Sequence, residues 1–293
     1  MSNEIPNINF KSNNSSKIDG IEIVMLENLI QKKDTFDHFP EKAHQLDFYM
    51  LVFYTEGETK HLVDFVWHEV RKNTLIYITK GQVNAFDFNK SLKGYMILFT
   101  EEYFKSQLNK LPKNELIRLF TSHLFSPKIQ IPLSSNVSNY IHLFYDEYNK
   151  GNEVFNKKTI LDSLYTIIFS KLEQHKQDQT FHIRESDKLE YFLKFKSSLE
   201  VNLRISRNAD FYAKKMNITY KHLNVICKEI VGLTAKQFID EFIILEAKRK
   251  LINSTIKSTE LAYLIGFEES TNFVKYFKKH TGLTPNVFKK QNS

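Results

Sequence analysis

The sequence contains a single cysteine, Cys227, among its 293 residues. One cysteine excludes an intrachain disulfide, and the chain has no Cys-x-x-Cys pair or Cys/His cluster with zinc-site spacing. Residues 1–17 are polar, without the apolar core of a signal peptide, and no apolar run approaches the about 18 residues of a membrane span. We therefore expect a cytoplasmic protein that does not enter a membrane, with a flexible N-terminus over residues 1–20.

Signatures of catalysis are missing as well. The sequence has no glycine-rich phosphate loop and no nucleophile-elbow motif. A barrel metalloenzyme needs a His-x-His pair together with a Glu and a distant His, whereas His44, His61 and His68 stand apart. We expect no catalytic residues, no cofactor and no bound metal.

Positive charge is unevenly distributed along the chain. Residues 186–293 carry 19 Lys and Arg against 11 Asp and Glu, a net charge of +8, whereas residues 1–185 carry 22 against 23, a net charge of −1. The length suits two domains, and a hydrophobic content of 42% is typical of folded ones. A basic domain beside a near-neutral one is the pattern expected when only one of them meets a polyanion.

Short β-rich runs separated by turn residues occupy residues 46–99. Runs of four to seven residues at about ten-residue spacing are typical of an antiparallel sandwich or barrel. We predict a small β-barrel built from five runs: Phe48–Tyr54, Leu62–Trp67, Leu75–Ile78, Val83–Phe88 and Tyr95–Phe99.

Helical periodicity follows the β-rich region. Apolar residues recur every three or four positions over 137–148 and 154–172, with Gly151 between, which predicts a helical hairpin. Ile160 and Ile167 add a second apolar stripe to the later helix, and two interpretations stay open: burial against the barrel, or a dimer interface. The segment that follows is polar, so we predict a first domain over 21–175, a linker over 176–185 and a second domain over 186–293.

Residues 208–232 predict a helix-turn-helix unit. Apolar residues face inward on both helices, and Thr219 is placed to cap the second helix through its hydroxyl. Early outward residues of the second helix are the ones that enter the DNA major groove in this motif. In this unit they are Tyr220, Lys221, His222, Asn224 and Val225.

Residues 257–282 repeat the layout. Gly266 ends the first helix, Ser270 can cap the second, and the outward residues are Thr271, Asn272, Lys275 and Lys278. Residues 234–252 predict one connecting helix of about 28 Å, close to the ~34 Å of one DNA turn, so the two units can enter successive major grooves.

This region resembles the AraC-type family of bacterial transcription regulators. Residues 246–251, EAKRKL, are similar to the family's EAKRLL stretch, and residues 266–285 resemble its signature GFxxxxxFxxxFKKxxGxTP in order and spacing. The resemblance implies base-reading positions at Lys221, Asn224, Val225, Thr271, Asn272 and Lys275.

Three departures from the family pattern bear on function. Cys227 replaces a Phe, and Val225 replaces a frequent Arg, which removes a bidentate contact to guanine. Leu264 replaces a polar residue; we favour burial within its own unit, with a contact to the other domain or to RNA polymerase as the alternative.

The first half is similar to the family's cupin-like sensing domain through short motifs, among them Phe39-Pro40, Glu56-Gly57 and Gly81-Gln82-Val83. Asn84 stands where relatives commonly have a metal-binding His. The resemblance implies a small-molecule effector, and the candidate pocket residues are His44, Tyr49, Trp67 and Asn84, for which a place in the core is the alternative.

These expectations combine into an α+β protein: a cupin-like β-barrel with a helical hairpin, then an all-α domain with two helix-turn-helix units. We predict a sequence-specific regulator of transcription, more often activating than repressing, with double-stranded DNA, an effector, RNA polymerase and a second copy of the chain as partners. The alternatives are a nucleoid protein without strong sequence preference, and a cupin metal enzyme fused to a DNA-binding module.

Overall fold

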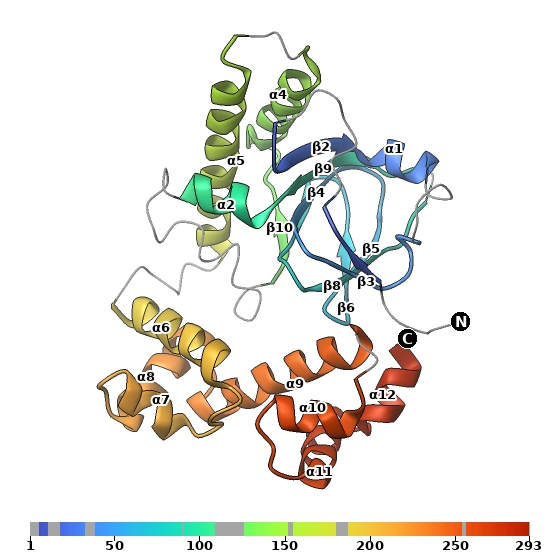
Figure 1. The fold of residues 1–293 in the computed structure, drawn as a ribbon. Helices are drawn as coiled ribbons and strands as arrows, with labels where there is room; N and C mark the ends of the chain where they lie inside the picture. Colours follow the sequence, from blue (N-terminus) through green and yellow to red (C-terminus); the bar gives the residue numbers. More distant parts are fainter. Residues whose placement is uncertain are drawn as a thin grey trace. The chain divides into compact units, whose positions relative to one another are not determined.

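The computed structural model describes residues 6–10, 18–32, 39–89, 91–108, 126–151, 155–179, 187–253 and 256–292 (Figure 1). Its contacts divide the chain into two compact units, one over 6–180 and one over 181–293. The first is rich in strands and the second is helical, as the fold class predicted from the sequence requires. We describe each unit by itself.

The described strands of the first unit form two five-stranded sheets, with the orders β1-β3-β8-β5-β6 and β10-β7-β4-β9-β2. The predicted barrel is therefore an open one made of two sheets. The strands are β1 (Asn7–Ile8), β2 (Ile21–Met25), β3 (His44–Leu46), β4 (Tyr49–Glu56), β5 (Thr59–Val63), β6 (Val66–Val70), β7 (Thr74–Ile78), β8 (Val83–Phe86), β9 (Lys93–Phe99) and β10 (Lys128–Gln130).

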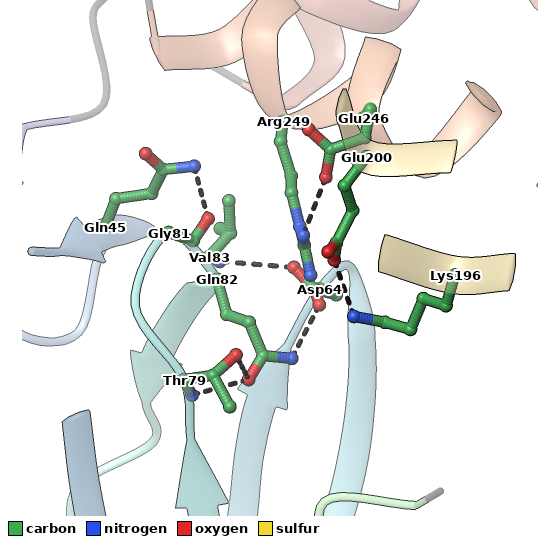
Figure 2. Close-up of polar contacts among 10 residues, drawn as sticks. All are labelled: Gln45, Asp64, Thr79, Gly81, Gln82, Val83, Lys196, Glu200, Glu246 and Arg249. Carbon is green, nitrogen blue, oxygen red and sulfur yellow. Dashed lines mark hydrogen bonds and ion pairs between the residues drawn. The ribbon is translucent and has the colours of Figure 1, made fainter. Parts of the chain in front are cut away.

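The predicted run Leu62–Trp67 is two strands rather than one. Asp64 and Phe65 form a tight turn between β5 and β6, both with positive φ, +47° and +70°. Figure 2 shows what holds the turn: the Asp64 carboxylate accepts hydrogen bonds from Gln82 Nε2, at 2.7 Å, and from the Val83 amide, at 3.3 Å. These partners lie some twenty residues away along the chain, so the local pattern could not reveal the turn.

Side-chain alternation along β4 divides the first unit into two cores. Met50, Val52 and Tyr54 face the space between the sheets. Leu51 and Phe53 face the opposite side, where they join the apolar residues of the helical hairpin in a second core. The strand is therefore buried on both faces.

The predicted hairpin is confirmed as α4 (Val137–Asn149) and α5 (Lys157–Gln179), which pack together on one side of the sheets (Figure 1). Shorter helices are α1 (Leu26–Gln31) and α2 (Glu101–Leu108). One stripe of α5 is buried, whereas Ile160 and Ile167 on its second stripe remain 37% and 40% exposed. Val154, assigned to this helix from the sequence, lies outside the described residues, and α5 continues four residues into the segment predicted as linker.

The second unit consists of seven described helices: α6 (Asp187–Asn202), α7 (Ala209–Lys215), α8 (Tyr220–Val231), α9 (Ala235–Asn253), α10 (Ser258–Leu264), α11 (Ser270–Thr281) and α12 (Pro285–Asn292). The connecting helix predicted over 234–252 is confirmed as α9, which lies between α7–α8 and α10–α12 (Figure 1). Across the described ranges, no helix is both long enough and apolar enough to cross a bilayer.

Candidate nucleic-acid interface

The first helix-turn-helix unit is formed by α7 and α8. Asn217 occupies the turn with φ of +56°, a left-handed conformation that asparagine tolerates better than most residues. The Thr219 hydroxyl accepts a hydrogen bond from the His222 amide at 3.1 Å, which confirms the predicted cap, and Gly232 ends α8 with φ of +72°. Both ends of this recognition helix are therefore fixed by local contacts.

One face of α8 is buried and the other is exposed. Leu223, Ile226 and Cys227 belong to the buried face, and burial raises the pKa of the Cys227 thiol to about 12. Four of the five residues assigned to DNA contact are exposed: Tyr220, Lys221, His222 and Val225.

Asn224 differs from the other predicted contact residues. It is half-buried, and its Oδ1 accepts a hydrogen bond from the Ala235 amide at 2.9 Å, at the first residue of α9. This bond orients the amide toward α9 and occupies one of the two lone pairs of Oδ1, leaving the second lone pair and both N–H donors. The structure thus gives Asn224 a role in joining α8 to α9.

The second helix-turn-helix unit is formed by α10 and α11. Phe273 and Phe277 are buried, whereas Thr271, Asn272, Lys275 and Lys278 are all exposed. The predicted Ser270 cap is wrong: Ser270 is already the first helical residue, and Glu269 occupies the N-cap without a side-chain bond to the backbone. The preference for burial of Leu264 is wrong as well, because this side chain is 43% exposed at the end of α10.

The two recognition helices carry lysines whose charge is not neutralised by a neighbouring carboxylate. Over the ranges that the structure describes, Lys221, Lys275 and Lys278 have no ion-pair partner. Five lysines on the other helices pair with a carboxylate, namely Lys188, Lys194, Lys196, Lys214 and Lys236, whereas Lys215 on α7 donates to the Asn202 amide oxygen instead. Unpaired lysines on two presented helices leave positive charge available to phosphates.

Of the four residues predicted to line an effector pocket, the structure brings together two. His44 on β3 lies directly opposite Asn84 on β8, and both are buried. The His44 Nδ1 atom lies 2.9 Å from the carbonyl oxygen of Lys42, to which it can donate a hydrogen bond, and Asn84 Nδ2 donates to the His44 carbonyl at 3.3 Å. Asn84 Oδ1 is buried and has no hydrogen-bond partner among the described residues.

Tyr49 and Trp67 do not join this pair. The Tyr49 ring stacks on Phe99 at 5.4 Å and packs with the core on the hairpin side of its sheet. Trp67 lies opposite Leu62 on the edge strand β6 and is 49% exposed. A shift of one residue along a strand reverses the face that a side chain occupies, and the sequence pattern had not fixed these positions.

The structure adds His61, which sequence reasoning had not assigned to the pocket. His61 is fully buried, its Nδ1 lies 2.7 Å from the Tyr54 hydroxyl, and its Nε2 has no partner among the described residues. Burial lowers the pKa of His61 to about 3, so the ring is neutral at physiological pH. His61 lies diagonally across the β5–β8 ladder from Asn84, so both residues face the space between the sheets.

Within the described part of the chain, no three His, Cys, Asp or Glu side chains converge as metal ligands would. The second unit instead carries two helix-turn-helix motifs, each with an exposed recognition face and unpaired lysines. These features define the class of double-unit DNA-binding proteins.

Comparison with known proteins agrees with this class. A family model described as a helix-turn-helix domain matches residues 212–291. The transcriptional activator RhaR of Cronobacter sakazakii is 20% identical over 87% of this chain and 90% of its own length. The Msm operon regulatory protein of Streptococcus mutans is 24% identical over 46% of this chain and 49% of its own. Among solved structures, ToxT from Vibrio cholerae is 12% identical over 94% of this chain and 100% of its own, with a TM-score of 0.49.

Residues 212–291 form an AraC-type helix-turn-helix domain, and most of the chain is similar to the transcriptional activator RhaR.

Proposed function

We propose that the protein is a sequence-specific transcription activator that places α8 and α11 in successive major grooves of double-stranded DNA. The observation that carries the proposal is the pair of exposed helix faces with unpaired lysines, joined by the 19-residue helix α9. At 1.5 Å per residue this helix is about 28 Å long, a separation compatible with one DNA turn. The relatives named as activators support the sign of regulation.

Within this proposal the exposed residues have different roles. Asn272 and Thr271 lie near the start of α11, where side chains reach base edges, and Tyr220, Lys221, His222 and Val225 occupy the corresponding part of α8. Lys275 reads a base and Lys278 contacts a phosphate. Asn224 holds the start of α9 through Oδ1 and keeps its N–H groups for a base.

The proposal is tested by selecting binding sites from a random duplex library with the full-length protein. We expect two short motifs about ten base pairs apart, bound at least 10³-fold more tightly than scrambled duplex. A nucleoid protein without sequence preference would enrich no motif, and that result would refute the proposal.

We further propose that the first unit binds a small effector between its sheets, at Asn84 and His61. One unpartnered buried oxygen and one unpartnered ring nitrogen on neutral side chains suit an uncharged molecule with hydroxyl or amide groups. Native mass spectrometry of protein purified from its own host measures this occupancy. Protein bearing one equivalent of transition metal instead would favour the metal-enzyme alternative.

Two protein partners complete the proposal. The exposed Ile160 and Ile167 stripe on α5 is the surface that we assign to a homodimer, and the exposed Leu264 is the residue that we assign to RNA polymerase. Sedimentation of Ile167→Glu tests the first assignment: a variant as dimeric as the parent would contradict it.

The second assignment is tested by measuring transcription from a promoter to which the Leu264→Ala variant is bound, and unchanged activation would contradict it. Because its proposed partner is double-stranded DNA, we expect the protein to act in the cytoplasm.

A further inference from the structure

A polar and aromatic cluster lies where the second recognition helix meets the connecting helix. The Tyr276 hydroxyl on α11 donates a hydrogen bond to Asp240 Oδ1 on α9 at 2.6 Å. Lys236, one turn earlier on α9, pairs with the same carboxylate, and its Nζ lies 5.9 Å from the centre of the Tyr276 ring. The Asp240 carboxylate is largely buried, so its contacts are little screened by solvent.

A second set of contacts joins the same region to the first helix-turn-helix unit. The Arg207 guanidinium, just before α7, stacks on the Phe267 ring at 3.6 Å, and Phe267 in turn contacts Tyr276 at 5.2 Å between ring centres. The neighbouring Gly266 has φ of +82°, and a Cβ there would lie 2.9 Å from the carbonyl oxygens of both Leu203 and Arg204. The segment before α7 and the turn before α11 are therefore in close contact.

These contacts connect the two helix-turn-helix units by routes other than the α9 backbone. A single helix leaves its two ends free to bend and to rotate relative to what they carry. Here the 203–207 loop contacts the turn before α11, and Asp240 accepts a hydrogen bond from Tyr276 on α11. Motion of α11 relative to α9 and the 203–207 segment must break at least one of these contacts, and α8 is tied to the start of α9 by the Asn224–Ala235 hydrogen bond.

We propose that Arg207, Asp240 and Tyr276 are positioning residues that fix α8 and α11 at one separation and one angle, so that the protein accepts a single spacing between its two half-sites. This inference rests on the proposed function. One inserted base pair shifts a half-site by about 3.4 Å and rotates it by about 34°. A rigid pair of helix-turn-helix units cannot follow that shift, whereas a loosened pair can.

Two variants and one control test the role of the cluster. Tyr276→Phe removes the hydroxyl and keeps the ring, and Asp240→Asn keeps the shape and removes the charge. Tyr263→Phe, at an exposed tyrosine on α10 outside the cluster, is the matched control. Thermal melting establishes that each full-length variant is folded.

The first measurement needs no DNA. Spin labels at Lys228→Cys on α8 and Lys279→Cys on α11, in a Cys227→Ala background, report the distribution of distances between the helices. We expect a narrow distribution for the parent and the control, and a broader one for both cluster variants. An unchanged width in both variants would overturn the proposal, and this result does not depend on whether the protein recognises a sequence.

The second measurement uses the duplex obtained by site selection, with a single base pair inserted or deleted between its half-sites. A hydrogen bond to a charged group shifts an equilibrium by about tenfold or more, so we expect the preference for the selected spacing to fall about tenfold in Tyr276→Phe. A uniform loss of affinity at every spacing would mean a merely structural role and would overturn the proposal. Failure of the parent to select any motif would refute the proposed function, while the distance distributions still decide the cluster.

Discussion

Asn272 and Lys278 are both exposed on α11, and we propose that their side chains recognise different parts of DNA. Asn272 lies in the first turn, where its amide can pair with adenine N6 and N7, a contact contributing about 1–3 kcal/mol of discrimination. Asn272→Ala should therefore relax base preference at one or two positions. Binding titrations on the selected duplex and its single-base variants measure this, and unchanged preferences would show that this part of α11 lies outside the groove.

Lys278 lies about two turns from the start of α11 and has a phosphate as its expected partner. Lys278→Ala should weaken binding to specific and random duplex alike, and the plot of log affinity against log salt should flatten by about one unit. The Asn272→Ala variant is the control, because a neutral amide displaces no counterion from DNA and its removal should leave the salt slope unchanged. A loss confined to the specific duplex would contradict the phosphate assignment.

His61 makes the stability of the first unit depend on pH. Its folded pKa, about 3, lies below the ordinary value of 6.5, so the unfolded chain gains a proton that the folded chain excludes as pH falls between these values. Stability is therefore full above pH 6.5 and should fall by up to about 1.4 kcal/mol per pH unit below it. Trp67, the only tryptophan, reports unfolding of this unit in urea.

His61→Gln provides the comparison, since an amide can bind the Tyr54 hydroxyl without titrating. We expect its stability to change less between pH 7 and pH 5 than that of the parent protein. His142→Gln, at an exposed histidine on α4, should behave like the parent. Parallel losses in His61→Gln and the parent would mean that another group causes the acid sensitivity.

At the scale of the elements, the sequence predicted what local spacing controls. The exposed and buried faces of α8 and α11 follow from a 3.6-residue period, and the Thr219 cap from a contact three residues away. Helix α6 was not assigned, although its buried Leu189, Phe192, Phe195 and Leu199 have helical spacing. Helix α12, which begins at Pro285, was not assigned either.

Features that depend on distant partners could not be predicted. The turn at Asp64 is held by a hydrogen bond from Gln82, and Asn224 accepts one from the first residue of α9. Tyr49 faces the hairpin because of the strand register. The pocket residues illustrate the limit most clearly: alternation shows that two faces exist, but pairing with another strand decides which residues meet. His61 could have been found only from its place opposite Phe86 and diagonal to Asn84.

For the whole molecule, we propose that residues 186–293 form an independent reader and that the linker is confined to 180–185, after the end of α5 at Gln179. This fragment should fold alone and retain specific binding, because both recognition helices, α9 and the Arg207–Asp240–Tyr276 contacts lie within it. A shorter fragment, 209–293, is the control: it lacks Phe192 and Phe195, whose rings pack on Phe238 at 4.9 and 5.8 Å. Circular dichroism and binding titration measure both, and a folded 186–293 fragment without specific binding would contradict the proposal.

The buried position of Cys227 has a practical consequence. Its thiol lies on the buried face of the first recognition helix, α8, and its pKa is about 12, so a thiol reagent in neutral buffer meets neither an accessible sulfur nor a thiolate. Modification must wait until α8 separates from the helices beneath it. Since the chain has no other cysteine, the rate at which one reagent group is added per molecule gives the opening frequency of this unit, with and without a promoter bound, from the unaltered protein.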